Sequence, residues 1–214
     1  MSTVVLMHAD AQVADRLRDQ IGAAPGFDVI GVAGSLAELR DVLKAGVPDL
    51  LIVDLMLPPT HLKVLMNGLR GPGRFGQPLI LVLAVSVDDA RLMDALRLGA
   101  DGYYAHARSS TSLLATIERL VNGESAMSPQ IARQVMSHFD ALTWQHIGIG
   151  ASALSPLKLS DMDRLLLQWT AEGYLVGEVA RGLQITPQAV GVRMRNIYRK
   201  LQTDLRAEAQ TLAA

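Results

Sequence analysis

The stretch "LLIVDLMLPP", Leu50 to Pro59, carries the pattern on which the fold prediction depends. A continuous apolar run ends at a carboxylate, Asp54, and the chain then turns at Pro58 and Pro59. A strand that is apolar throughout is typical of a parallel sheet covered on both faces. Because a buried strand gains nothing from a charge at its tip, Asp54 is a candidate reactive group as well as a candidate strand end.

Residues 1–123 alternate between short apolar runs and segments with helical periodicity. The runs lie at 3–7, 27–33, 49–54, 79–85 and 102–106, and the helical segments at 11–21, 36–46, 60–70, 88–100 and 110–123. This alternation predicts an α/β, flavodoxin-like, doubly wound domain with five parallel strands. Ligands of such sheets bind outside the carboxyl ends of the strands, where Asp54 would lie.

The second half of the chain has a different pattern. From Ser160 onward the periodicity is purely helical, which predicts a small all-α domain over residues 158–214 with helices at 160–171, 175–183, 187–201 and 204–213. Residues 124–157 are rich in Gly and Ser toward their end and read as a linker, with a short helix near 128–139. The predicted order is therefore α/β domain, linker, all-α domain.

Composition and charge exclude several classes of protein. The absence of cysteine excludes disulfides, thiolate zinc sites and cysteine nucleophiles. No apolar run approaches the length of a membrane span and "STVVLMH" is too short for a signal peptide, so we expect a cytoplasmic protein with no membrane partner. The net charge is −1, yet five basic residues and no acidic one lie between Arg181 and Lys200. This local basic run indicates a polyanionic partner, although a solvated helix face would look the same by charge alone.

"PDLLIVDLMLP", together with "FDVIGVAGSLAELRDVLKAGVPDLL" upstream and "ALRLGADGYYAHARSSTSLLATIERLVNGE" downstream, resembles the receiver domain of response regulators over residues 3–123. The resemblance implies phosphorylation of Asp54, with Mg²⁺ offsetting the charge. In the family the metal is held by an acid pair after the first strand, the phosphoacceptor and a backbone carbonyl two residues later. These positions are matched to Ala9 and Asp10, Asp54 and Met56, so that Asp10, Asp54 and Met56 are the candidate metal ligands.

Several matched positions depart from the receiver pattern. Ala9 replaces an acid, Ala84 replaces the Thr or Ser at the end of the fourth strand, and His106 replaces the Lys at the end of the fifth. Tyr103 matches the switch aromatic. Because lost charges and donors weaken stabilisation of a phosphoryl group, we interpret the receiver as phosphorylated poorly or not at all, with weak Mg²⁺ binding at most. The other histidines are interpreted as incidental.

"LSDMDRLLLQWTAEGYLVGEVARGLQITPQAVGVRMRNIYRKL", residues 159–201, resembles the LuxR-type helix-turn-helix. Together with a receiver this names the NarL/FixJ type of response regulator. The resemblance implies a DNA-binding transcription regulator rather than an enzyme. The alternatives are an ordinary phosphorylation-activated regulator and, remotely, an aspartate-nucleophile phosphotransferase, which would need a further general acid near Asp54.

The expected DNA contacts lie on the recognition helix. Thr186 can cap that helix and Pro187 suits its first position. The family's groove-facing positions fall on Gly191, where Lys is usual, and on Val192 and Arg195, with Arg195 as a candidate reader of guanine. The candidate DNA-binding residues are Thr186, Gln188, Val192, Arg193, Arg195, Arg199 and Lys200.

The resemblance also implies partners. They are DNA, a sensor histidine kinase or an unidentified ligand, and a second copy of the chain. We expect a homodimer on a two-half-site operator, and one candidate dimer surface is the C-terminal helix with Leu205, Ala209 and Leu212 on one side.

Overall fold

The computed structural model describes residues 1–70, 77–87, 90–106, 112–146 and 159–211. The chain divides into two compact units, Met1–Asn122 and Gly123–Ala214, each of which is described by itself. Within the described ranges no helix is both long enough and apolar enough to cross a membrane.

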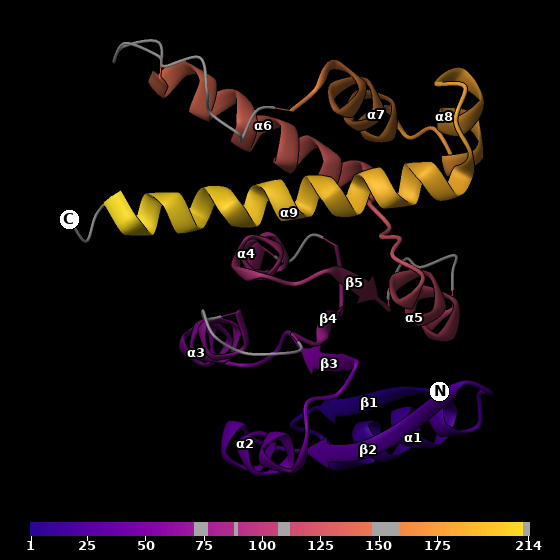
Figure 1. Cartoon of the computed structure of the whole chain (residues 1–214), viewed down its shortest axis with the longest axis vertical. Coiled ribbons are helices and arrows are strands. Elements are labelled where there is room, and N and C mark those ends of the chain that lie inside the picture. The colour runs from indigo at the N-terminus through magenta and orange to yellow at the C-terminus, as the bar shows by residue number, and fades with distance from the viewer. Residues whose placement is uncertain (71–76, 88–89, 107–111, 147–158, 212–214) are drawn as a thin grey trace. The chain divides into compact units, whose positions relative to one another are not determined.

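The N-terminal unit is built on a five-stranded parallel sheet (Figure 1). The strands are β1 (Ser2–Met7), β2 (Phe27–Ala33), β3 (Leu50–Asp54), β4 (Leu79–Ala84) and β5 (Gly102–Ala105), in the order β2-β1-β3-β4-β5. The chain winds outward from β1 first to one edge and then, through β3, to the other. This is the doubly wound topology that the alternating pattern predicted, and the fold prediction is confirmed.

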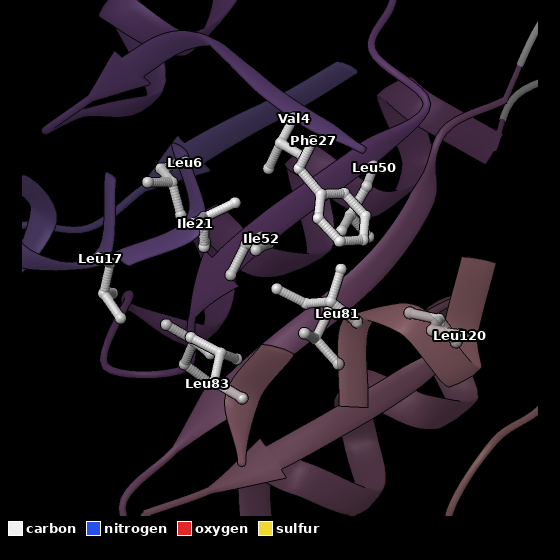
Figure 2. Close-up of a cluster of buried hydrophobic side chains, with 12 residues drawn as sticks. Val4, Leu6, Leu17, Ile21, Phe27, Leu50, Ile52, Leu81, Leu83 and Leu120 are labelled. Atoms are coloured by element: carbon white, nitrogen blue, oxygen red, sulfur yellow. The ribbon is translucent and has the colours of Figure 1, made fainter. Parts of the chain in front are cut away.

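Helices cover both faces of this sheet (Figure 1). On one face lie α1 (Ala11–Gly22) and α5 (Leu113–Val121), and on the other lie α2 (Leu36–Ala45), α3 (Pro59–Arg70) and α4 (Ala90–Leu98). Figure 2 shows the core on the α1/α5 side, where helix side chains such as Leu17 and Leu120 meet strand side chains such as Ile52, Leu81 and Leu83. Burial on both faces explains why the strands are apolar throughout.

The C-terminal unit contains α6 (Pro129–His146), α7 (Asp161–Glu172), α8 (Val176–Gly182) and α9 (Pro187–Thr211). The short helix predicted near residues 128–139 is thus an 18-residue helix. It packs on α7, because Arg133 Nη2 donates a 2.7 Å hydrogen bond to the Ala171 carbonyl and Arg164 lies 3.1 Å from Asp140. The predicted linker stretch therefore contributes a helix to the C-terminal unit, and its remainder at 147–158 lies outside the described residues.

The turn between α8 and α9 confirms the predicted cap. Gln184 adopts a left-handed conformation, with φ of 56°, which reverses the chain after α8. Thr186 Oγ1 then accepts a 3.1 Å hydrogen bond from the Ala189 amide, so the threonine satisfies one of the free amides at the start of α9. Pro187 is the first residue of the helix, as expected.

Helix α9 runs without interruption to Thr211, so the prediction of separate helices at 187–201 and 204–213 was wrong. Residues 202 and 203 are Gln and Thr, neither of which breaks a helix as Gly or Pro does. The Thr203 hydroxyl bonds back to the Arg199 carbonyl at 2.9 Å, which accommodates it within the helix. The side chains of Leu205, Ala209 and Leu212 lie outside the described residues.

Candidate functional sites: a strand-edge carboxylate and a recognition helix

Asp54 is the last residue of β3 and lies at the carboxyl edge of the sheet. It is 8% exposed, and its Oδ1 accepts a 3.0 Å hydrogen bond from the Met56 amide. The neighbouring strands β4 and β5 end at the same edge. Their last paired residues are Leu83 with Tyr104 and Ala84 with Ala105. The sequence thus predicted correctly that this carboxylate would lie at the strand edge.

The residue that follows β1, His8, lies beside this carboxylate. Because Met7 pairs with Val53 in the β1–β3 register, His8 follows opposite Asp54. His8 Nε2 lies 3.6 Å from Asp54 Oδ2, and His8 Nδ1 accepts a 3.0 Å hydrogen bond from the Asp10 amide. That bond places the proton of the neutral ring on Nε2, toward the carboxylate. Sequence reasoning missed His8, which it took for incidental.

Asp10 has a structural task that the sequence analysis did not assign. It is the N-cap of α1, and its Oδ1 accepts hydrogen bonds from the Gln12 and Val13 amides at 2.9 and 3.1 Å. The acid pair of the receiver pattern was matched to Ala9 and Asp10, but β1 ends at Met7, so the two residues that directly follow the strand are His8 and Ala9. The match is therefore one residue too far along the chain, and neither of the two residues after the strand is an acid.

These side chains fit Mg²⁺ poorly. Magnesium prefers hard oxygen ligands in octahedral geometry, whereas an imidazole lies against Asp54 and a capping bond engages Asp10. Among the residues that the structure describes, no cluster of three or more His, Cys, Asp or Glu could hold a metal ion. The Met56 side chain is exposed, and its sulfur lies 3.4 Å from Arg91 Nη2.

The other matched receiver positions also lack phosphate-binding groups. Ala84 is buried at the end of β4, where its carbonyl accepts a 3.1 Å hydrogen bond from the His106 amide. The His106 ring packs edge-on against Tyr104, with 5.0 Å between ring centroids. Tyr103, the predicted switch aromatic, is 8% exposed. The Lys that the receiver pattern has at the end of β5 is thus replaced by an imidazole whose ring contacts a neighbouring ring edge-on.

The open face of α9 carries part of the predicted DNA-binding set. Thr186, Gln188, Val192 and Arg199 are exposed, and their contact with DNA stays a prediction. A shallow surface groove runs along this face, and it is lined by Thr186, Gln188, Ala189, Val192, Arg193 and Asn196. Asn196, which is also exposed, was missed in the sequence, although its four-residue spacing from Val192 places it on the same face.

Two of the predicted DNA-binding cations are engaged within the domain. Lys200 Nζ lies 2.7 Å from Asp163 Oδ2, and Arg193 Nη1 lies 3.4 Å from Asp163 Oδ1. Asp163 is 5% exposed and forms a capping box with Ser160 at the start of α7. Lys200 therefore ties α9 to α7, and its role in DNA binding stays a prediction.

The partners of Asp163 change the pKa of its buried carboxyl group. Burial alone would raise the pKa of Asp163, but hydrogen bonds from Lys200 and Ser160 and the charge of Lys200 outweigh it. The pKa of Asp163 is lowered as a result. The carboxylate is held in its charged form by partners that come from two helices.

Arg195 does not face outward as predicted. Its side chain is buried, with 7% of the residue exposed, on the face of α9 that also carries Gly191. Residues 123–126 lie against that face, since a Cβ at Gly191 would be 2.9 Å from the Cβ of Glu124. In this arrangement Arg195 is not available to a base edge.

Known proteins are similar to this chain over both of its units. Residues 157–213 match the GerE family model, described as bacterial regulatory proteins, luxR family. The nitrate/nitrite response regulator protein NarL of Escherichia coli (strain K12) is 25% identical over 212 residues, which cover 97% of this chain and 93% of NarL. A nitrate/nitrite response regulator protein homolog of Haemophilus influenzae is 30% identical over 190 residues, which cover 87% of this chain and 83% of the relative.

Solved structures share the fold. RcsB from Salmonella enterica serovar Typhimurium, bound to promoter rprA, matches with a TM-score of 0.52 and 20% identity over 94% of this chain and 92% of RcsB. A LuxR-family two-component response regulator from Aurantimonas matches with a TM-score of 0.53 and 24% identity over 64% of this chain and 97% of that one.

The relatives extend across both units, and the luxR-family match falls on the unit that contains α7, α8 and α9. The chain therefore belongs to the NarL/FixJ-type response regulators, DNA-binding transcription regulators that join a receiver domain to a LuxR-type helix-turn-helix domain.

Proposed function

We propose that this regulator binds its operator through α9 as a homodimer, and that its receiver is not controlled by Mg²⁺-dependent phosphorylation of Asp54. The observation that carries the second part is the position of His8, whose Nε2 lies 3.6 Å from Asp54 Oδ2. An imidazole stands where Mg²⁺ binding calls for a hard oxygen ligand.

The charge balance at the strand edge supports this proposal. A phosphorylated aspartate adds about 1.5 to 2 negative charges, which need nearby donors and cations. Ala84 has no side-chain donor, and the ring of His106 packs on Tyr104. Phosphoryl oxygens at Asp54 would therefore gain little from these two positions.

The first part of the proposal rests on the open face of α9 and on the nature of the relatives. Gln188 and Val192 are exposed near the N-terminal end of the helix, which is the end that reads bases in helix-turn-helix proteins. Among the similar structures are two RcsB dimers bound to two parallel DNAs. A dimer would place two such helices on two half-sites.

The receiver then needs another signal. We propose that a ligand, or association of the chain with itself, replaces the phosphoryl group, so that a sensor histidine kinase is dispensable. Asp54 keeps a role in this scheme as a buried carboxylate that holds the Met56 amide and lies against His8.

Intact-mass measurement after incubation with acetyl phosphate and Mg²⁺ tests the phosphorylation part. We expect the wild-type mass to remain that of the unmodified chain, as it should for the Asp54→Asn control. Near-complete addition of one phosphoryl group to the wild type, and none to the control, would restore the ordinary phosphorylation-activated regulator.

Fluorescence anisotropy tests the DNA part independently. We expect the wild type to bind a duplex enriched from a randomised pool more tightly than a scrambled duplex at the same salt concentration. Failure to bind either duplex at low salt would contradict the DNA part without affecting the receiver part.

A further inference from the structure

The turn after β3 carries an exposed methionine beside the buried carboxylate of Asp54. Met56 is the second residue after the strand, and its amide donates a 3.0 Å hydrogen bond to Asp54 Oδ1. Asp54 is 8% exposed, whereas Met56 is 60% exposed. The backbone of Met56 is therefore fixed to the strand edge, while its thioether is open to small reagents in solution.

Exposure distinguishes Met56 from the other methionines of the chain, all nine of which lie within the described ranges. Met7, Met66 and Met194 are no more than 1% exposed. Apart from Met1 at the N-terminus, the remaining methionines are buried or half-buried. An oxidant has to reach the sulfur atom to convert it to a sulfoxide, so Met56 is the internal methionine that should react first.

A guanidinium group lies beside this sulfur atom. Arg91 is the second residue of α4, which begins at Ala90, and its Nη2 lies 3.4 Å from Met56 Sδ. A thioether sulfur is a weak acceptor, whereas oxidation makes the side chain polar and gives it a sulfoxide oxygen. Hydrogen bonds from a charged donor such as arginine are shorter and stronger than neutral ones. The donor that an oxidised Met56 needs is therefore already in place.

We propose that Met56 is an oxidation site through which the receiver senses a small peroxide. Oxidation turns the thioether into a sulfoxide, whose oxygen accepts a hydrogen bond from Arg91 and so holds the turn after β3 on the first turn of α4. The same turn is bonded to Asp54 through the Met56 amide, so the mark acts directly beside the strand edge. This inference rests on the proposed function, in which the receiver responds to a signal other than phosphorylation of Asp54.

The chemical step needs only the peroxide as co-reactant. The sulfur lone pair attacks one oxygen of hydrogen peroxide and the O–O bond breaks. The proton of the transferred hydroxyl passes to the departing hydroxide, which leaves as water, so that sulfur loses two electrons and the peroxide gains them. A thiol-dependent sulfoxide reductase reverses the step and yields water and a disulfide. Because the chain has no cysteine, no thiol of its own competes for the oxidant.

Peptide mass measurement on the full-length protein tests the site itself. With limiting hydrogen peroxide, Met56 should be largely oxidised while the buried Met7 and Met66 stay reduced. The Met56→Leu variant should gain oxygen mainly at Met1 under the same conditions. It is therefore the matched control for the effects of oxidation elsewhere in the chain.

Hydrogen exchange and DNA binding test what the sulfoxide does. The oxidised wild type should exchange its amide hydrogens more slowly over Ala90–Leu98 than the reduced wild type, and Arg91→Gln should abolish this difference. We expect the oxidised wild type to bind the enriched duplex about five- to tenfold more tightly, at the lower end of typical coupling between sites. Met56→Gln, whose amide oxygen stands in for the sulfoxide oxygen, should bind as tightly without peroxide. Sulfoxide reductases with a thiol should reverse the changes in the oxidised wild type.

Several outcomes would overturn the proposal. Met56 could be oxidised no faster than the buried methionines, which would remove it as a site. Complete oxidation of Met56 could leave exchange over α4 or the affinity for the enriched duplex unchanged, which would make the sulfoxide an incidental surface modification. Failure of both oxidised and reduced protein to bind any duplex at low salt would contradict the proposed DNA binding and the signalling role with it. Phosphorylation of reduced wild type by acetyl phosphate would contradict the proposed function of the receiver alone, because the oxidation of Met56 is measured separately.

Discussion

Lys200 Nζ on α9 and Asp163 Oδ2 on α7 lie 2.7 Å apart, and this contact joins the recognition helix to the first helix of the DNA-binding domain. The carboxylate is nearly fully buried, while the ammonium group keeps some contact with solvent. A buried carboxylate that loses a partner keeps its desolvation cost. The pair is therefore a structural element of the domain, although both residues come from segments that the sequence associates with DNA.

The first prediction concerns stability. Lys200→Met should lower the free energy of unfolding by about 1.5–3 kcal/mol, because a hydrogen bond to a charged, buried group is lost. Chemical denaturation measures the change. Arg199→Met is the matched control, since Arg199 is the exposed neighbour on the same helix and should change stability little. Equal effects of the two substitutions would contradict a structural role for Lys200.

The second prediction concerns acid. The pKa of folded Asp163 lies below its unfolded value, so the carboxylate contributes stability that is fully present above about pH 4. That contribution is lost as the pH falls through the folded pKa. Asp163→Asn should be less stable than the wild type at neutral pH, and the difference should narrow on acidification below about pH 4. Thermal unfolding of both proteins between neutral pH and acid measures this difference in stability. A difference that stays constant at every pH would contradict a lowered pKa of Asp163 in the folded state.

The third prediction compares two cations on α9, the exposed Arg199 and Lys200, which contacts Asp163. Arg199→Ala should weaken binding to enriched and scrambled duplexes alike and lower the salt slope by about one, as expected for a lost phosphate contact. Lys200→Ala should show its main effect in unfolding. Anisotropy titrations at two salt concentrations provide the comparison. An unchanged salt slope for Arg199→Ala would remove it from the DNA contacts.

The sequence predicted features that depend on local pattern and failed where distant segments meet. Apolar runs and helical spacing are local, and so is the cap at Thr186. His8 was missed because its place beside Asp54 follows from the β1–β3 register, which joins residues far apart in the chain. Only the end of the apolar run at Met7 signalled that His8, rather than Ala9, is the first residue after the strand.

The burial of Arg195 has the same origin. A helical projection of α9 places it outward, and only the packing of residues 123–126 reverses that result. The signal in the sequence was Gly191, a helix-weakening residue with no turn nearby to require it. The pairing of Lys200 with Asp163 likewise joins residues from two helices, and charge counting along one helix does not reveal it.

The fourth prediction concerns a variant that carries the phosphorylation-site side chains of the receiver pattern. The combined variant His8→Asp, Ala9→Asp, Ala84→Thr and His106→Lys supplies two acids, a hydroxyl and an ammonium group at the carboxyl edge of the sheet. With Mg²⁺ and acetyl phosphate it should acquire a phosphoryl group to a much greater extent than the wild type. The same variant with Asp54→Asn should remain unmodified. If the combined variant stays as unreactive as the wild type, the four substituted side chains do not explain poor phosphorylation.

The last prediction concerns the open face of the recognition helix. Val192 and Asn196 are exposed, one turn apart, and both line the groove that begins at Thr186. An asparagine can pair with adenine through two hydrogen bonds, and a valine methyl can contact the methyl group of thymine. Asn196→Ala should therefore cost about 1–3 kcal/mol on the enriched duplex and relax the preference at one operator position.

Gln168→Ala provides a matched control, because Gln168 is an exposed amide on α7 that bonds to Glu172. It should leave binding to both duplexes unchanged. Anisotropy with single-base variants of the enriched duplex locates the position that Asn196 reads. An equal loss on enriched and scrambled duplexes would assign Asn196 to the DNA backbone. No loss on either duplex would remove Asn196 from the DNA contacts.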